Sequence, residues 1–255
     1  MAKILAFANQ KGGIGKTTSA INVAAGIGLL GKKVLLVDLD PQGNSTSGVG
    51  VNKRAVKASS YDVLISRAEA TDALLKTPYD NLYIMPANMN LAAAEFELVS
   101  VSGREKRLDN ALSACKNAFD YIIVDCPPSL GILTINALAA SDGLIIPMQC
   151  EYYALEGITD LLTSIKMCSK RLNRRLGIEG IVLTMYDSRA NLTTQVANEL
   201  RRYLGDKVYE TVIPRSVRLS EAPSHGLPGV VYDRINRGSK AYMALAVEFI
   251  ARSEK

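Results

Sequence analysis

The sequence contains no tryptophan, a single histidine and only four cysteines, so several kinds of site have few residues to build on. The cysteines are Cys115, Cys126, Cys150 and Cys168, and they show no C-x-x-C spacing and no neighbouring histidine. A disulfide framework or a thiolate metal site depends on such spacing. We therefore interpret the four cysteines as small buried apolar residues in a reducing compartment.

Long apolar runs are also missing. No apolar run reaches 18 residues, and no charged leader precedes an apolar stretch with a cleavage site. The apolar start, Lys3–Ala8, is too short for a signal peptide and continues directly into a glycine-rich motif. The sequence therefore predicts a cytoplasmic protein with no membrane partner.

Positive charge is unevenly distributed along the chain, although the net charge of +5 is modest. Residues 160–255 contain 16 Lys and Arg against 10 Asp and Glu, whereas residues 1–159 contain 14 against 15. A basic C-terminal third indicates a surface that binds a polyanion, but charge alone does not name the partner.

Apolar β-branched runs alternate with longer helical stretches along the chain. Most of the strand candidates are continuous Val, Ile and Leu runs, as expected for parallel strands covered on both faces. This alternation predicts an α/β fold, a doubly wound and mostly parallel sheet with helices on both faces. No repeat, linker or boundary interrupts it, so we expect a single domain over residues 1–255.

We expect strands at Lys3–Asn9, Lys33–Asp38, Leu82–Pro86, Tyr121–Asp125, Gly143–Gln149, Ile178–Met185 and Val208–Pro214. We expect helices at Lys16–Leu30, Gly103–Ala118, Leu130–Ala140, Ala154–Leu172, Asn191–Leu204 and Ser239–Ala251. Ligands of such sheets bind beyond the carboxyl ends of the strands. Glycine-rich or acidic residues follow the first, second and fourth expected strands, which places a site there.

A phosphate-binding loop follows the first expected strand. Residues 11–18 read Lys-Gly-Gly-Ile-Gly-Lys-Thr-Thr and fit G-x-x-x-x-G-K-[ST] loosely, because Gln10 stands where the first glycine would be. Glycines let backbone N–H groups approach phosphate oxygens, and the following helix adds its positive end. We expect Lys16 to contact the β- and γ-phosphates of ATP and the Thr17 hydroxyl to bind Mg²⁺.

Carboxylates lie at the ends of two further strands. Asp38 and Asp40 end the second strand, ahead of a loop that Pro41 and Gly43 enforce. The residues alone leave open that these two aspartates only cap the following turn. The apolar run Ile122–Val124 is followed by Asp125, shortly before a double proline. An apolar strand that ends in aspartate is the Walker B pattern, and it predicts that Asp125 holds Mg²⁺ through water.

The order K-G-G-x-G-K-T at residues 11–17 resembles the deviant Walker A motif of the MinD/ParA superfamily of partition and septum-positioning ATPases. Further blocks resemble the chromosome partition ATPases of the ParA/Soj type, and the resemblance covers essentially the whole chain. These blocks are Asp38-Leu-Asp-Pro-Gln-Gly-Asn, Asp125-Cys-Pro-Pro-Ser, residues 149–157 and residues 213–223.

The resemblance implies a role for each site residue. Lys11 would cross a dimer interface into the partner's nucleotide site, and Gly12 would lie at the crowded centre of that interface. Asp40 would position the attacking water and bind Mg²⁺ with Thr17 and Asp125, while Asp38 would assist the metal shell. The implied catalytic residues are Lys11, Lys16 and Asp40. The implied ATP-binding residues are Lys11, Gly12, Gly13, Ile14, Gly15, Lys16, Thr17, Thr18, Met185, Pro214 and Arg215. The resemblance implies that the last three of these lie at the adenine.

Three relatives of that type fit the sequence less well. The C-terminal residues 241–251 lack the basic amphipathic pattern of a membrane-bound septum positioner. Iron–sulfur carriers need cluster-ligating cysteines in suitable loops, which are missing. Larger plasmid partition ATPases carry an N-terminal helix-turn-helix, for which the ten residues before the loop leave no room.

Base-specific DNA recognition needs a reading helix or ribbon, and none is evident. Scattered basic residues suit sequence-independent phosphate contacts instead. The resemblance singles out Arg189 and Arg218, with Lys240 as a third, as contacts to non-specific double-stranded DNA. It also implies a slow, nucleoid-associated ATPase that dimerises on ATP and is stimulated by a ParB-like centromere-binding protein. The alternatives are positioning of a protein cargo and, in a different class, a P-loop biosynthetic or metal-insertion enzyme.

Overall fold

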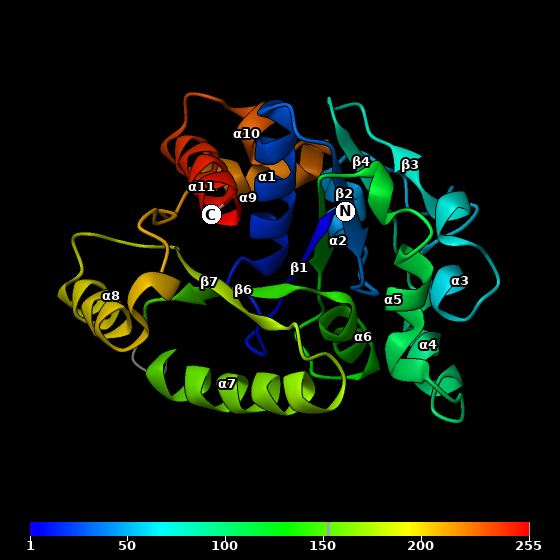
Figure 1. Ribbon diagram of the computed structural model, residues 1–255. Helices are drawn as coiled ribbons and strands as arrows, with labels where there is room; N and C mark the ends of the chain where they lie inside the picture. Colours follow the sequence, from blue (N-terminus) through cyan, green and yellow to red (C-terminus); the bar gives the residue numbers. More distant parts are fainter. Residues whose placement is uncertain (152–153, 255) are drawn as a thin grey trace.

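Seven strands form one sheet in the part of the chain that the computed structural model describes, residues 1–151 and 154–254 (Figure 1). The order across the sheet is β3-β4-β2-β5-β1-β6-β7, and all neighbours pair parallel except β3 with β4. The strands are β1 Lys3–Phe7, β2 Val34–Asp38, β3 Leu75–Lys76, β4 Leu82–Met85, β5 Tyr121–Asp125, β6 Gly143–Gln149 and β7 Gly177–Thr184. The prediction of a doubly wound, mostly parallel sheet is confirmed.

Helices cover both faces of this sheet. They are α1 Lys16–Leu29, α2 Asn44–Gly48, α3 Ser60–Leu64, α4 Leu91–Glu97, α5 Arg107–Leu112, α6 Ile132–Ala140, α7 Ala154–Arg171, α8 Asn191–Leu204, α9 Val217–Glu221, α10 Gly229–Tyr232 and α11 Arg237–Ser253. Figure 1 shows α1, α10 and α11 on one side of the sheet and α6 and α7 on the other.

Each central strand is buried on both faces, which explains its continuous apolar sequence. In β1, Leu5 and Phe7 belong to the core cluster beneath α1 and α11, whereas Ile4 and Ala6 belong to the cluster beneath α5–α8. Side chains alternate between the two faces of a strand, so a strand covered twice has to be apolar at every position.

The prediction of a seventh parallel strand at Val208–Pro214 is wrong. Only isolated bridges, Ile181 to Val208 and Tyr186 to Pro214, join this segment to its neighbours. The Glu248 carboxylate accepts hydrogen bonds from the backbone amides of residues 210 and 211. Those amides are therefore not available to a ladder, and proline has no amide to offer.

The helix predicted at Gly103–Ala118 is broken into α5 and flanking 3₁₀ turns at Arg104–Lys106 and Lys116–Ala118. The side chain of Asn136 accounts for the first break. Its amide oxygen accepts from the Leu108 amide at 3.1 Å, and its nitrogen donates to the Arg104 carbonyl at 2.8 Å. These bonds replace the intrahelical ones at the start of the predicted helix.

The order of the strands brings the functional loops together. β2, β5 and β1 are neighbours, and Asp125 lies level with Asp38 on one side and with Phe7 on the other. The loops that follow these three strands therefore begin side by side at the carboxyl edge of the sheet, where ligands of doubly wound folds bind.

Candidate functional site

The loop between β1 and α1 has the backbone of a phosphate-binding loop. Gly13 and Gly15 have left-handed φ values of 73° and 88°, which side chains disfavour. Helix α1 begins at Lys16 with no side-chain cap and no acidic residue in its first turn. Its first amides are therefore open to an anion. A Cβ atom built on Gly12 would meet nothing within 4 Å in this chain.

Lys16 is buried, and its ammonium points back into the loop, where it donates to the Lys11 carbonyl at 2.8 Å. Burial lowers the pKa of Lys16, and the nearby Asp125 and Asp40 carboxylates act in the opposite direction. An anion that enters the loop can take the place of the carbonyl as the partner of this ammonium.

Asp125 is fully buried and only partly satisfied. Its Oδ2 accepts from the Ser45 hydroxyl at 2.8 Å, whereas its Oδ1 has no hydrogen-bond partner among the described residues. Burial, with the nearby Asp38 carboxylate, raises the pKa of Asp125 to about 8. A buried carboxylate oxygen without a donor is the kind of group that a divalent cation or its bound water satisfies. The residues therefore fit the predicted Mg²⁺.

Asp38 is also fully buried, but its oxygens are already engaged. They accept from the Thr46 amide and hydroxyl at 2.8 and 2.7 Å and from the Asp40 amide at 3.1 Å. Burial raises the pKa of Asp38 to about 6, and these hydrogen bonds oppose the rise. The implied role of Asp38 in the metal shell is therefore not supported by its contacts. Asp38 fixes the turn after β2, the alternative that the residues alone had left open.

Asp40, in contrast, faces a cavity. One of its oxygens accepts from the Gln42 amide at 2.9 Å, and the residue lines an open cavity of about 550 Å³ at the loop, the phosphate cavity. This cavity also contains most of the predicted phosphate-binding residues. They are Gly12, Gly13, Gly15, Lys16, Thr17 and Thr18. The rest of the lining is Pro41, Gln42, Asn44, Pro128 and Met185.

A smaller pocket of about 120 Å³, the side pocket, adjoins the phosphate cavity. Gly15, Thr18 and Met185 line both, and the side pocket is completed by residues that include Ile213–Ser216 and Leu219. The structure therefore brings the three implied adenine contacts, Met185, Pro214 and Arg215, together beside the phosphate loop.

Lys11 and Ile14 do not line either cavity. The Ile14 side chain is buried and its carbonyl accepts from the Thr184 hydroxyl at 2.8 Å, so this residue can contribute only main-chain groups. The half-exposed Lys11 side chain is not part of the lining of its own phosphate cavity and pairs with Glu151.

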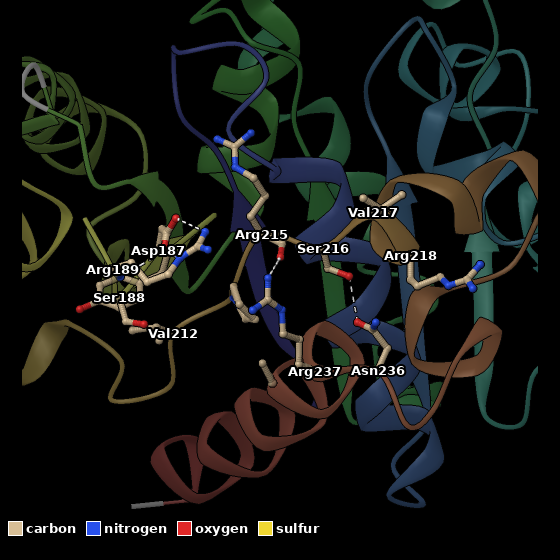
Figure 2. Close-up of a pocket in the computed structure, with 13 residues that line it drawn as sticks. Asp187, Ser188, Arg189, Val212, Arg215, Ser216, Val217, Arg218, Asn236 and Arg237 are labelled. Atoms are coloured by element: carbon tan, nitrogen blue, oxygen red, sulfur yellow. Dashed lines mark hydrogen bonds and ion pairs between the residues drawn. The ribbon is translucent and has the colours of Figure 1, made fainter. Parts of the chain in front are cut away.

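The arginines expected to contact DNA lie on one groove. Arg189 and Arg218, with Arg215 and Arg237, line a groove of about 770 Å³, the arginine groove (Figure 2). Lys240 is exposed but is not among the residues that line it.

Several residues of the site were not predicted. Ser45 and Thr46 bind Asp125 and Asp38, and Thr184 holds the phosphate loop from β7. The run of small hydroxyl residues at 45–47, directly after the acidic turn, is the signal that could have indicated the first two. No helix within the described ranges is both long and apolar enough to span a bilayer.

Comparison with known proteins identifies the family. A family described as an AAA domain matches residues 2–178. The sporulation initiation inhibitor protein Soj of Bacillus subtilis is 55% identical over 98% of this chain and 99% of its own length. The chromosome-partitioning ATPase Soj of Treponema pallidum is 51% identical over 99% of this chain and 98% of its own length.

A solved structure is similar over the whole chain. Cobyrinic acid a,c-diamide synthase from Mycobacterium smegmatis, with a bound ATP analogue and magnesium, gives a TM-score of 0.88 at 34% identity. The match covers 100% of this chain and 97% of that one. ATP and Mg²⁺ are thereby supported as the cofactors of this fold. The chain belongs to the AAA domain family and, within it, to the Soj/ParA group of chromosome-partitioning ATPases.

Proposed function

We propose that this single-domain chain is an ATP-driven switch for DNA partition. Two copies associate face to face around two ATP molecules, the dimer binds DNA without sequence preference, and hydrolysis separates the copies. The observation that carries the proposal is the position of Lys11. Its side chain begins in the phosphate loop yet does not line that loop's own cavity, and it pairs with the half-exposed Glu151, a carboxylate that the phosphates of a second subunit can replace.

Within one subunit the residues divide the work of phosphoryl transfer. Lys16 and the loop amides of Gly12–Thr18 bind the phosphates, with Ile14 contributing through its main chain. Thr17, Asp125 and Asp40 hold Mg²⁺, partly through water, and Mg²⁺ neutralises charge on the β- and γ-phosphates when bound. Asp40, which faces the phosphate cavity, orients the attacking water.

The catalytic set is Lys11, Lys16 and Asp40, with Lys11 acting from the opposite subunit. Transfer of a phosphoryl group needs positioning and charge stabilisation more than covalent chemistry, so these groups suffice for a slow ATPase. The open space around Gly12 allows another subunit to approach the loop closely. The side pocket accepts the adenine against Met185, Pro214 and Arg215.

DNA binds through Arg189 and Arg218, with Lys240 as an outlying third contact. A basic surface assembled from two subunits binds much more tightly than one half, because the second half is held at high effective concentration. A ParB-like centromere-binding protein stimulates hydrolysis, and repeated release from and return to the nucleoid moves the DNA cargo.

Two other functions use the same nucleotide site. The same switch could position a protein cargo, and a structural relative at 34% identity is named as a biosynthetic synthase. Proteins named for chromosome partitioning match at 51% and 48% identity over nearly their full lengths, which favours partition over a biosynthetic reaction. An assay for ATP-dependent amide formation on cobyrinic acid tests the biosynthetic alternative directly.

The decisive experiment measures oligomeric state and DNA binding with a nonhydrolysable ATP analogue, with ADP and without nucleotide, at two salt concentrations. We expect a dimer and salt-sensitive DNA binding only with the ATP analogue. Lys11→Ala should remain a monomer that binds nucleotide, whereas the control Lys57→Ala, at an exposed lysine that lines neither the phosphate cavity nor the side pocket, should dimerise normally. A wild-type protein that stays monomeric at saturating analogue contradicts the proposal.

A further inference from the structure

The arginine groove is built from three segments that are distant in sequence. They are the loop after β7 at residues 186–189, residues 212–218, and the start of α11 at residues 236–241. Figure 2 shows Arg215 and Arg237 between Arg189 at one end and Arg218 at the other. Four arginines and one aspartate line the groove, a net charge of +3. Its chemistry suits a string of phosphates.

The two end arginines are already paired with carboxylates. Arg189 donates to both oxygens of Asp187, each at 2.9 Å, and Arg218 lies 3.0 Å from a Glu221 oxygen and 3.7 Å from an Asp233 oxygen. Each pair places a negative charge beside the arginine that a phosphate would approach. Part of the attraction for an anion is therefore cancelled at both ends of the groove.

The two central arginines have no carboxylate partner within the described residues. Both are exposed, and the one hydrogen bond between them runs from Arg237 Nη2 to the Arg215 backbone carbonyl at 2.8 Å. Neither forms a close ion pair there, although the Asp187 carboxylate interacts with Arg237 over a longer distance, so their guanidinium charges are less compensated than those at the two ends. A phosphate backbone laid along it would find its strongest contacts at the centre rather than at the ends.

The segment Pro214–Ser216 lines the arginine groove and also the side pocket on its other side. Two hydrogen bonds tie this shared wall to the start of α11. Arg237 binds the Arg215 carbonyl, and the Ser216 hydroxyl lies 2.9 Å from the Asn236 side-chain oxygen. The packing is close, because a Cβ atom on Gly238 would lie 3.0 Å from the Ser216 Cβ. A shift of the wall therefore reaches the groove arginines directly.

We propose that the arginine groove binds DNA phosphates chiefly through Arg215 and Arg237. We further propose that the nucleotide base in the side pocket changes the position of these arginines by moving the shared wall Pro214–Ser216. This inference rests on the proposed function, since it takes DNA as the polyanion and the side pocket as the base site. Arg237 contacts phosphate and also positions Arg215. Nucleotide occupancy on one side of the wall thereby sets the groove geometry on the other.

The first test compares Arg237→Ala with Arg234→Ala, a matched control that removes an exposed arginine of the same segment that does not line the groove. Both variants should still dimerise with the ATP analogue. Losing one phosphate contact in each of two subunits should weaken DNA binding about 30-fold near physiological salt and lower the salt slope by about two. Arg234→Ala should change neither. Equal affinities for the two variants would overturn the phosphate contact.

The second test isolates the shared wall in the monomer. ADP is added, and hydrogen exchange is followed at the amides of Ile213, Arg215 and Ser216 and at those of residues 236–238. ADP should slow exchange in both segments of the wild type and of Arg234→Ala. In Arg237→Ala the protection at 236–238 should be lost while that at 213–216 persists. Unchanged exchange at 236–238 in the wild type overturns the coupling.

The outcomes separate this inference from the proposed function. If ADP fails to protect the phosphate loop at residues 12–18, or if the ATP-bound dimer does not bind DNA at all, the proposed function fails. If an acidic peptide competes for the groove while DNA does not, the groove is a protein-binding site and the inference fails. If the dimer binds DNA and Arg237→Ala has no effect, only the inference fails.

Discussion

Charged side chains are buried in one functional region and exposed to solvent in the other. In the phosphate cavity, Lys16 and Asp125 are buried at the carboxyl edge of the sheet, with 6% and 0% exposure. In the arginine groove, the Arg189 side chain is 87% exposed. Buried charges interact strongly and depend on one another, whereas exposed ones are screened and act nearly independently. Single substitutions should therefore abolish function in the first region and reduce it by degrees in the second.

The largest effect is expected from Lys16→Ala. The substitution removes the ammonium proposed to bind two phosphates and leaves the nearby Asp125 and Asp40 carboxylates without its positive charge. Two charge-assisted hydrogen bonds are lost, so ATP affinity should fall about 10²- to 10⁴-fold. Titration with a fluorescent ATP analogue measures this. A reduction of less than tenfold would place Lys16 outside the phosphate site.

Asp40→Ala should leave binding intact and remove turnover. Asp40 faces the phosphate cavity, and within the described residues its side chain accepts a hydrogen bond from the Gln42 amide alone, so the fold tolerates the change. Hydrolysis should slow about 10²- to 10³-fold while the ATP-bound dimer becomes long-lived. Phosphate release and dimer lifetime are measured side by side. Asp80→Ala, at an exposed aspartate away from the site, serves as the control.

The raised pKa of Asp125 predicts a pH dependence for the buried region. Without metal, the folded protein keeps a proton on Asp125 up to about pH 8, whereas the unfolded chain loses it near 3.8. The free energy of unfolding of the metal-free protein should therefore fall as pH rises through this window. Mg²⁺ needs the ionised carboxylate, so its affinity should rise with pH from 6 to 8, by up to about tenfold per pH unit.

Thermal unfolding in EDTA and in Mg²⁺ with ADP, from pH 6 to pH 9, checks this prediction. Asp125→Asn removes the titrating group and should flatten both profiles. A wild-type profile that is already flat would show that Asp125 is ionised throughout.

The smallest effects belong to the exposed region. Arg189 is paired with Asp187 and holds the pKa of that carboxyl down at about 2, so the pair stays charged at any usable pH. Asp187→Asn removes the competing carboxylate and should tighten DNA binding about two- to fivefold. Arg189→Ala should weaken it and lower the salt slope. Fluorescence anisotropy measured against salt concentration distinguishes the two variants. Weaker DNA binding by Asp187→Asn would contradict the idea that Asp187 competes with phosphate for Arg189.

The buried region was largely predictable from the sequence, because its determinants are local. The spacing of Gly12–Thr17, Asp40 and Asp125 relative to three apolar runs was enough to place them at one edge of the sheet. The contacts of Asp38 were not predictable, because its partner, Thr46, lies eight residues along a turn whose path the sequence does not specify. Val208–Pro214 looked like a strand because its apolar pattern does not reveal that Glu248 binds the backbone there.

The arginine groove was only partly predictable. Arg189 and Arg218 came from resemblance to a family, and no pattern in the chain places them beside Arg237, which belongs to a separate helix. Arg215 was expected at the adenine alone, whereas it lines both the side pocket and the groove. Surfaces assembled from distant segments depend on the tertiary fold and carry no periodic signal in the chain.

The need for glycine at position 12 does not come from the fold of a single chain. The fold places no atom within 4 Å of where a methyl group on residue 12 would sit, and its backbone angle is not left-handed. An alanine there should leave the free protein as heat-stable as before. Any cost it carries has to come from whatever docks onto the loop, so one added methyl group distinguishes the requirements of assembly from those of folding.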